Sequence, residues 1–173
     1  KADADLIQRM EQRKLDLETE IKLFKQRIHD LLLSESQWEQ AAGFLLTIKG
    51  IGTITAAWLL VATHCFVRCE TPEQAASFAG LAPHAKDSGE QQGHRSIGGT
   101  GHQQLRNCLY MASTPASRFN PILKPYYDQL VARGKPKKVA RCAVARKLIH
   151  IAWACVTKQR NFDPDFAKKK QVA

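Results

Sequence analysis

The first 40 residues carry apolar side chains in a heptad pattern. Residues 3–40 contain no glycine or proline. Alternating steps of three and four residues separate the apolar positions, once Lys14 is allowed at one of them: Ile7, Met10, Leu17, Ile21, Phe24, Ile28 and Leu31. This pattern predicts a long coiled-coil helix that pairs with a second copy of the protein or with another helix of a longer protein. The alternative is a single amphipathic helix packed on its own domain.

A second apolar stretch, LLTIKGIGTITAAWLL at residues 45–60, is interrupted by two glycines. The interruption predicts a tight hairpin between two helices, with Thr53 capping a second helix that begins at Ile54. The stretch resembles the helix-hairpin-helix motif, in which a glycine backbone and free helix N–H groups approach a phosphate. On this interpretation Lys49, Gly50, Gly52 and Thr53 contact nucleic acid. Alternatively, the glycines only make a close corner between two helices.

Capping residues and helix breakers divide the rest of the chain into further helices. Thr71, followed by Pro-Glu-Gln, is a helix start, and Gly80 ends that short helix. Asn120 caps a helix in which Pro125 predicts a kink or a late start. The other predicted helices span residues 101–116, 121–133 and a last segment up to Lys158, whose apolar face includes Val139. Apart from a possible extended piece at 65–68, no strand pattern is evident, so the sequence predicts an all-α protein.

Between these helices lies a polar stretch, Gly80 to Arg106, with the sequence GLAPHAKDSGEQQGHRSIGGTGHQQLR. Its glycines and its proline break any regular element. Long polar loops in compact domains are usually functional or disordered, and the helical flanks favour an ordered loop on a helical scaffold. This loop therefore carries the candidate chemistry.

Charge is distributed unevenly along the chain. The net charge is +10; residues 1–40 hold nine acidic against seven basic residues, and residues 41–173 hold seven against nineteen. We therefore divide the chain into a coiled-coil segment (1–42), a helical domain (43–160) and a basic tail (161–173). The basic domain predicts a DNA or RNA partner, because neutralising phosphates releases counterions. Within it, a cluster of cations predicts contact with a nucleic-acid backbone: Lys135, Lys137, Lys138 and Arg141.

Cysteine usage and apolar run length place the chain in a reducing, non-membrane setting. The apolar runs are too short to span a bilayer. Five cysteines make an odd count without a CxxC pair, which favours free thiols in the cytoplasm. A zinc corner at His64, Cys65 and Cys69 lacks a second pair of ligands, so we predict no metal in this chain.

Three stretches in order carry a resemblance to a known family: GIGTITAAWLL, the loop segment ASFAGLAPHAKDSGEQQGHRSIGGTGHQQLRNCLYMAS, and RFNPILKPYYDQLVARGKPKKVARCAVARKLIHIAWA. Over about residues 44–158 the chain resembles the C-terminal domain of transposases of the IS110 insertion-sequence family, which are DEDD transposases related to the Piv and MooV invertases. The resemblance implies a serine-dependent DNA recombinase of bacteria or archaea, directed by a bridge RNA as guide. It also implies a RuvC-like nuclease domain before the coiled coil, whose four acidic residues hold magnesium, so this chain would hold only part of the enzyme.

The resemblance also assigns roles in the loop. The serine before a glycine after GLAP is the nucleophile, which is Ser88 here; Ser96 and Ser113 are the next candidates. Lys86, Arg95 and Arg106 are the nearest cations for stabilising charge on a phosphate, and His84 or His94 could move protons. The sequence departs from the family's basic Ser-Lys-Arg-Gly run, since Ser96 is followed by Ile-Gly-Gly.

Two functions of other classes remain as alternatives. The first is an architectural nucleic-acid-binding module that uses the helix-hairpin-helix stretch without chemistry of its own. The second is a coiled-coil assembly domain whose basic surface has no partner.

Overall fold

The computed structural model describes residues 2–34, 36–84, 87–88, 91–92, 96–97 and 101–166. In this part of the chain the helices are α1 (Ala2–Ser34), α2 (Ser36–Leu46), α3 (Thr53–Thr63), α4 (Pro72–Phe78), α5 (Gln103–Phe119), α6 (Leu123–Ala132) and α7 (Lys137–Thr157). Short antiparallel pairs join β1 (Pro83–His84) to β4 (Ser96–Ile97) and β2 (Asp87–Ser88) to β3 (Gln91–Gln92). The predicted all-α class is confirmed.

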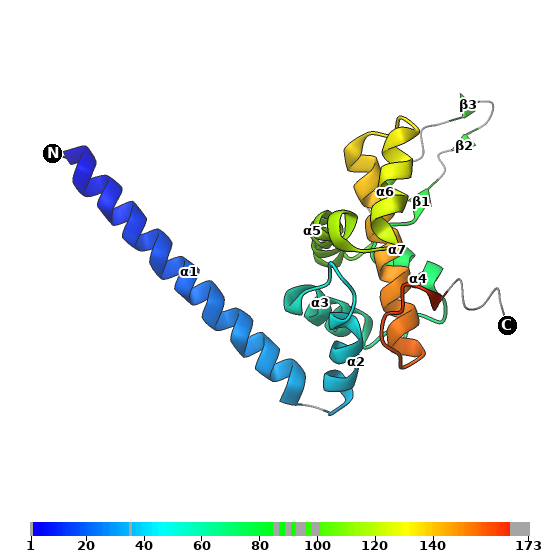
Figure 1. Cartoon of the computed structure of the whole chain (residues 1–173), viewed down its shortest axis with the longest axis horizontal. Coiled ribbons are helices and arrows are strands. Elements are labelled where there is room, and N and C mark those ends of the chain that lie inside the picture. Colours follow the sequence, from blue (N-terminus) through cyan, green and yellow to red (C-terminus); the bar gives the residue numbers. More distant parts are fainter. Residues whose placement is uncertain are drawn as a thin grey trace.

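Helix α7 runs through the middle of the compact part of the molecule (Figure 1), where it contacts α2, α4, α5 and α6. Its buried residues are Ala140, Val144, Ala145, Leu148, Ile149, Ala152, Cys155 and Val156. The predicted apolar face is wrong at Val139, which is 52% exposed. Because neighbouring helices cover α7 on several sides, its buried positions do not form a single stripe.

Helix α1 projects away from the other helices (Figure 1). Only its C-terminal end joins the core, where Leu32 is buried and Ile28 packs against buried residues. The predicted continuous helix over residues 3–40 is divided, because α1 ends at Ser34 and α2 begins at Ser36. The change of direction allows α2 to bury its own apolar residues against α3 and α7. Pairing of α1 as a coiled coil stays a prediction.

The predicted corner at the two glycines separates α2 from α3. Thr53 is not the cap of α3; the capping position is Gly52, and no side chain caps this helix. Gly50 has a φ of +112°, and a Cβ atom there would lie 2.6 Å from the Cβ atom of Ala116 in α5. Gly50 therefore lets the backbone of the corner pack directly on α5, a contact that any side chain would block.

Two predicted helix starts are confirmed in their chemistry. Thr71 Oγ1 accepts a hydrogen bond from the Gln74 N–H at 3.2 Å, and Gln74 Oε1 accepts one from the Glu70 N–H at 2.8 Å. Helix α6 begins at Leu123, which is the late start that Pro125 allowed. Pro125 then lies in the first turn, where its missing N–H removes no helical hydrogen bond.

The extended piece predicted at residues 65–68 is wrong, since this segment forms turns. His64, Cys65 and Phe66 all have positive φ values, between 48° and 64°. Thr63 Oγ1 accepts a hydrogen bond from the Phe66 N–H at 2.9 Å, and the turn places the Phe66 ring in the core. Burial of this ring offsets the strain of a left-handed backbone, which a pattern of residue types does not reveal.

Hydrogen bonds of the Asn120 side chain link the α2–α3 corner to the junction between α5 and α6. Its side chain is buried; Nδ2 donates to the Lys49 carbonyl at 3.0 Å, and Oδ1 accepts from the N–H groups of Ile122 and Leu123. The acceptor atom of Asn120 thus binds N–H groups at the start of α6, but the predicted capping position is wrong, since the capping residue of this helix is Ile122 and no side chain caps it. The donor atom adds a contact across 71 residues of sequence.

We expect Asn120→Ala to lower the free energy of unfolding by about 1–3 kcal/mol, because it leaves a buried carbonyl and two N–H groups without their partner. Urea denaturation of the chain, followed by circular dichroism, measures the change. Asn107→Ala is the matched control, since Asn107 is exposed in α5, and it should change stability by less than about 0.5 kcal/mol. Equal effects of the two substitutions would contradict the role given to Asn120.

Candidate nucleic-acid interface

A basic groove lies where the end of α5, the helix α6 and the start of α7 meet. Its volume is about 640 Å³. Its lining residues are Ser117, Arg118, Lys124, Tyr127, Asp128, Val131, Ala132, Lys137 and Arg141. Four of these side chains are cationic and one is acidic. Helices α5, α6 and α7 therefore together place four cations around one open groove.

The charges in the basic groove are only partly compensated. Lys124 Nζ lies 2.8 Å from Asp128 Oδ2, one turn further along α6. Arg141 Nε is buried and has no hydrogen-bond partner among the described residues. A buried guanidinium N–H without a partner is unfavourable, and an anionic oxygen at this position would relieve that cost. The groove is thus suited to an anion such as a phosphate.

The sequence predicted part of this groove. Lys137 and Arg141 lie one turn apart on α7 and line it, whereas Lys135 and Lys138 are exposed near the start of α7 without lining it. Arg118 and Lys124 were missed, because neither has a second cation within one turn of its own helix. Only the packing of α6 against α5 and α7 brings these two cations to the cluster on α7.

The N-terminus of α3 forms a second candidate contact. Lys49 and Gly52 are exposed, and Thr53 is half-buried at the first position of the uncapped helix. The Lys49 carbonyl is bound by Asn120, and the Lys124 N–H donates to the Asn120 carbonyl at 2.9 Å. Asn120 therefore connects the hairpin of α2 and α3 to α6, which carries part of the basic groove. The α-carbon of Gly50 packs against α5. A phosphate contact of Gly50, as predicted, would therefore use its backbone N–H.

The loop that carries the candidate serines is closed at its base. Gly101 has a φ of +99°, and a Cβ atom there would lie 2.6 Å from the Gly80 nitrogen. The His102 N–H donates to the Phe78 carbonyl at 2.8 Å, and the His102 ring packs between Trp58 and Phe78, with centroid distances of 5.8 Å. The two ends of the loop therefore touch each other on a fixed part of the fold.

Within the loop, the backbone pairs Ser88 with Gln91 and His84 with Ser96. Three of the sequence candidates, Lys86, His94 and Arg95, lie outside the described residues. Arg106 is half-buried in the first turn of α5.

The third candidate serine lies in a different environment. Ser113 is in the middle of α5, where its side chain is buried and its hydroxyl donates to the Tyr110 carbonyl at 2.5 Å. A nucleic-acid phosphate could not reach this hydroxyl without opening the core. Ser113 is therefore poorly placed for attack on an external substrate.

The five cysteines are buried or half-buried. All five are free, and burial raises the pKa of Cys65, Cys69, Cys142 and Cys155, which disfavours their nucleophilic thiolate form. Among the described residues, no three His, Cys, Asp or Glu side chains are grouped so that they could hold a metal ion. Nor does any helix in this part of the chain have the length and hydrophobicity needed to cross a membrane.

Comparison with known proteins identifies a gene-inverting protein and proteins of insertion elements as relatives. Over 140 residues the chain is 34% identical to the pilin gene-inverting protein of Moraxella bovis. The aligned region covers 79% of this chain and 43% of that protein. It is 33% identical to the uncharacterized 43.6 kDa protein of insertion element IS110 from Streptomyces coelicolor, over 64% of this chain and 27% of that protein.

A third relative is the uncharacterized 42 kDa protein of insertion element IS900 from Mycobacterium paratuberculosis, which is 28% identical over 71% of this chain and 31% of its own length. The chain thus spans less than half the length of these relatives. The family model described as the IS116/IS110/IS902 transposase family matches residues 42–128, from the middle of α2 to the middle of α6. This match covers half of the chain, and with it we conclude that the chain belongs to the IS116/IS110/IS902 transposase family.

Proposed function

We propose that this chain is the C-terminal part of a serine-dependent, RNA-guided DNA recombinase, which binds nucleic acid and supplies a nucleophilic serine. The observation that carries the proposal is the basic groove of α5, α6 and α7 in a chain of a transposase family. DNA and the guide RNA are the proposed partners. The RuvC-like domain implied by the resemblance would complete the site in the whole protein.

Nucleic-acid binding follows from the chemistry of the basic groove. Arg118, Lys137 and Arg141 line it, and the Lys124–Asp128 pair is exposed, so water weakens that pair. Contacts of this kind recognise phosphates without reading bases, and they fix the position of a duplex on the protein. The uncapped N-terminus of α3, with Lys49 beside it, is the second proposed phosphate contact.

The proposed chemical step is attack by Ser88 Oγ on a DNA phosphorus atom. The Oγ–P bond forms, the bond from phosphorus to one deoxyribose oxygen breaks, a proton carrier takes the serine proton, and the leaving oxygen gains a proton to become a hydroxyl, so that the protein becomes joined to the strand. Arg106, Lys86 and Arg95 are the proposed cations that stabilise the charge on the phosphate, and His84 or His94 the proposed proton carriers. The closed base at Gly80 and Gly101 supports this proposal, because a loop whose two ends are held together can present a hydroxyl from a defined place on the fold.

Among the described residues no three His, Cys, Asp or Glu side chains gather, so this part of the chain offers no cluster of acidic ligands for magnesium. In phosphoryl-transfer sites Mg²⁺ is usually held by one or two carboxylates together with substrate phosphates and water. We therefore assign the metal to the acidic residues of the separate nuclease domain and route no step through it here.

The second candidate function is a non-catalytic nucleic-acid-binding module. The uncapped α3 N-terminus beside exposed Lys49 and Gly52 favours it, because this arrangement can hold a phosphate without any serine. The two functions share the binding surfaces. They differ in whether a serine is needed for strand exchange.

The basic groove is tested by removing its charges one at a time. We expect Arg118→Gln and Lys137→Gln each to weaken binding to duplex DNA equally for unrelated sequences, and to lower the slope of log affinity against log salt by about 1. Fluorescence anisotropy across a salt series measures both quantities. Lys158→Gln is the matched control, since Lys158 is exposed beyond the end of α7 and outside the groove. An unchanged slope for Arg118→Gln and Lys137→Gln would remove the groove from the interface.

A further inference from the structure

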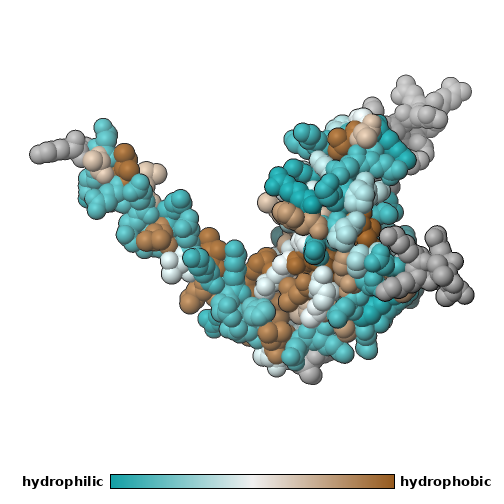
Figure 2. Space-filling model, in the orientation of Figure 1, coloured by the Kyte–Doolittle hydropathy of each residue, from teal (hydrophilic) through white to brown (hydrophobic). Residues whose placement is uncertain are grey.

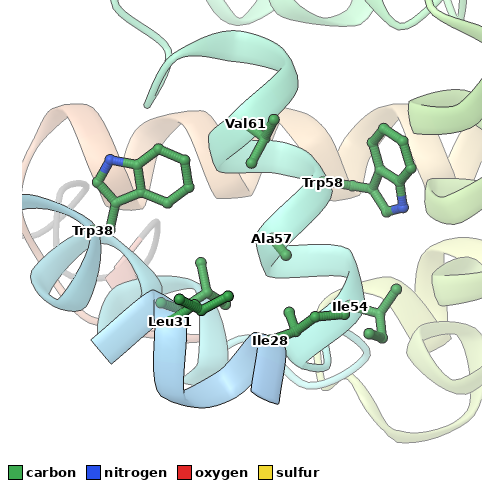
Figure 3. A pocket seen from close by; sticks show the side chains of 8 residues that line it. Ile28, Leu31, Trp38, Ile54, Ala57, Trp58 and Val61 are labelled. Carbon is green, nitrogen blue, oxygen red and sulfur yellow. The ribbon is translucent and has the colours of Figure 1, made fainter. Parts of the chain in front are cut away.

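An apolar groove lies between the end of α1, the start of α2 and one side of α3. Its lining residues are Ile28, Leu31, Leu32, Trp38, Ile54, Ala57, Trp58 and Val61, and its volume is about 370 Å³. Figure 3 shows side chains of α1 and α2 meeting the side of α3 that carries Ile54, Ala57 and Val61. Every lining residue is apolar, so the site suits an apolar helix and not a phosphate.

The apolar groove continues into the heptad seam of α1. Leu31 lines the groove and is still 62% exposed, and toward the N-terminus the seam residues are about half exposed or more: Phe24, Ile21, Leu17, Met10 and Ile7. Figure 2 shows apolar patches along α1, whose surface is otherwise mostly hydrophilic. One apolar surface therefore runs along the projecting helix and ends between α1 and α3.

We propose that a second copy of this chain covers this surface, with its α1 antiparallel to the first and its N-terminal turns seated in the apolar groove. Each copy would then fill the groove of the other. The proposal rests on the coiled-coil pairing predicted from the sequence and not on the serine chemistry. Helix α1 spans roughly 50 Å at 1.5 Å per residue, which is long enough for a stable pair.

The heptad register of α1 allows every seam position to be paired in an antiparallel dimer. Antiparallel coiled coils place an a position opposite a d position of the partner. The resulting pairs use every seam position of both helices: Ile7 with Leu31, Met10 with Ile28, Lys14 with Phe24, and Leu17 with Ile21. Ile7 and Met10 of the partner subunit therefore arrive beside Leu31 and Ile28, which line the groove.

Lys14 distinguishes the two orientations. In a parallel pair each Lys14 would face Lys14 of the partner subunit inside the seam, where like charges repel and lose water. In the antiparallel pair Lys14 faces Phe24 of the partner subunit, and a lysine over an aromatic ring is attractive. A parallel pair would gain contacts between Arg13 and Glu18 at the exposed edge, but such surface ion pairs contribute little.

The distribution of charge along α1 agrees with this orientation. Residues 2–20 hold six acidic and three basic side chains, and residues 21–34 hold one acidic and three basic. An antiparallel pair sets the acidic half of each helix beside the basic half of the other, whereas a parallel pair sets like halves together.

The apolar groove itself also favours the antiparallel orientation. In a parallel pair the partner helix end that reaches the groove would be the C-terminal end of its α1, which already packs against its own α2 and α3. In the antiparallel pair the arriving end is the N-terminal one. Its apolar residues Leu6, Ile7 and Met10 are each more than half exposed, so they are available for burial.

Cysteine cross-linking tests the orientation. We expect a tagged copy with Ile7→Cys and an untagged copy with Leu31→Cys, mixed and mildly oxidised, to give the tagged–untagged dimer as the main product. Both positions are exposed in the single chain, so neither substitution should disturb its folding. The unsubstituted chain shows the background from the five native cysteines. Dimers of the Leu31→Cys copy with itself would show a parallel pair and overturn the proposal, as would a monomeric chain at micromolar concentration.

A bulky side chain placed in the apolar groove tests whether the partner helix occupies it. We expect Ala57→Trp to weaken self-association by about tenfold or more, because an indole ring would occupy the space of the partner helix. Val139→Trp, at an exposed position of α7, is the matched control and should leave the dissociation constant unchanged. Analytical ultracentrifugation measures it, and circular dichroism confirms that both variants fold. Unchanged association of Ala57→Trp would overturn the seating in the groove. DNA binding by the same variants, measured separately, reports on the proposed function.

Discussion

Replacing Ser88 with alanine, in a full-length protein that carries this chain with its nuclease domain, is expected to abolish the covalent protein–DNA adduct. The substitution removes the only oxygen of that side chain, and loss of a nucleophile lowers rates by roughly a thousandfold or more. DNA binding should stay the same, because no charge changes. Incubation with guide RNA and target DNA, followed by denaturing electrophoresis, reveals an adduct as a shifted band. Strand exchange, measured across the new junctions, should disappear with it.

Two further serines provide the controls. Ser113→Ala should leave the adduct intact, because its hydroxyl is buried in α5 and bound to the Tyr110 carbonyl. Ser96→Ala tests the other serine of the loop, which pairs with His84 on the neighbouring strand. If the adduct persists in Ser88→Ala and vanishes in Ser96→Ala, the nucleophile is Ser96. If it persists with every serine replaced, the chain is the architectural module and the proposed chemistry is wrong.

Residues with strong local conformational preferences made the helix ends predictable from the sequence. Thr71 and the residues after it cap α4 in the way that their chemistry requires. Gly134, at a φ of +78°, follows α6 close to the predicted stop. In both places the decisive interaction lies within four residues of sequence. A pattern of residue types can therefore identify it without any knowledge of tertiary contacts.

Interactions between distant segments explain what the sequence did not reveal. No glycine or proline marks the end of α1, which stops where α2 must turn to reach the core. Arg118 and Lys124 were missed because only packing of α5, α6 and α7 brings them to Lys137. The capping role of Gly52 was assigned to its neighbour Thr53, whose side chain makes no cap. Each case depends on contacts that a single helix does not contain.

In the loop, too, some features could be predicted from nearby residues and others could not. Its position and its closed base follow from glycines that the sequence displays, namely Gly80 and Gly101, which touch each other. The short ladders that pair Ser88 with Gln91 and Ser96 with His84 were not predicted. Two-residue strands carry too few positions for a repeat of two to be recognised. The catalytic assignment of Ser88 therefore rests on the family and on the proposed experiment.

The two glycines of the α2–α3 corner should respond to the same substitution in opposite ways. Gly50→Ala is expected to lower the free energy of unfolding by about 2–5 kcal/mol, through overpacking against α5 and backbone strain together. Its new methyl group would lie 2.6 Å from the Ala116 Cβ atom and 2.9 Å from the Ala116 Cα atom, and its φ of +112° disfavours any L side chain. Helix α5 cannot retreat easily, because it also packs against α6 and α7.

Gly52→Ala is the matched control in the same corner. Gly52 has a φ of −103°, which alanine adopts readily, and a Cβ atom there would meet nothing within 4 Å among the described residues. The poorer capping by alanine and the lower entropy of its unfolded chain nearly cancel, so stability should change by less than about 0.5 kcal/mol. Thermal and urea denaturation of both variants measure the difference. Equal stabilities would show that the corner can move away from α5. Packing would then not explain the glycine at position 50, and phosphate binding would be the better explanation.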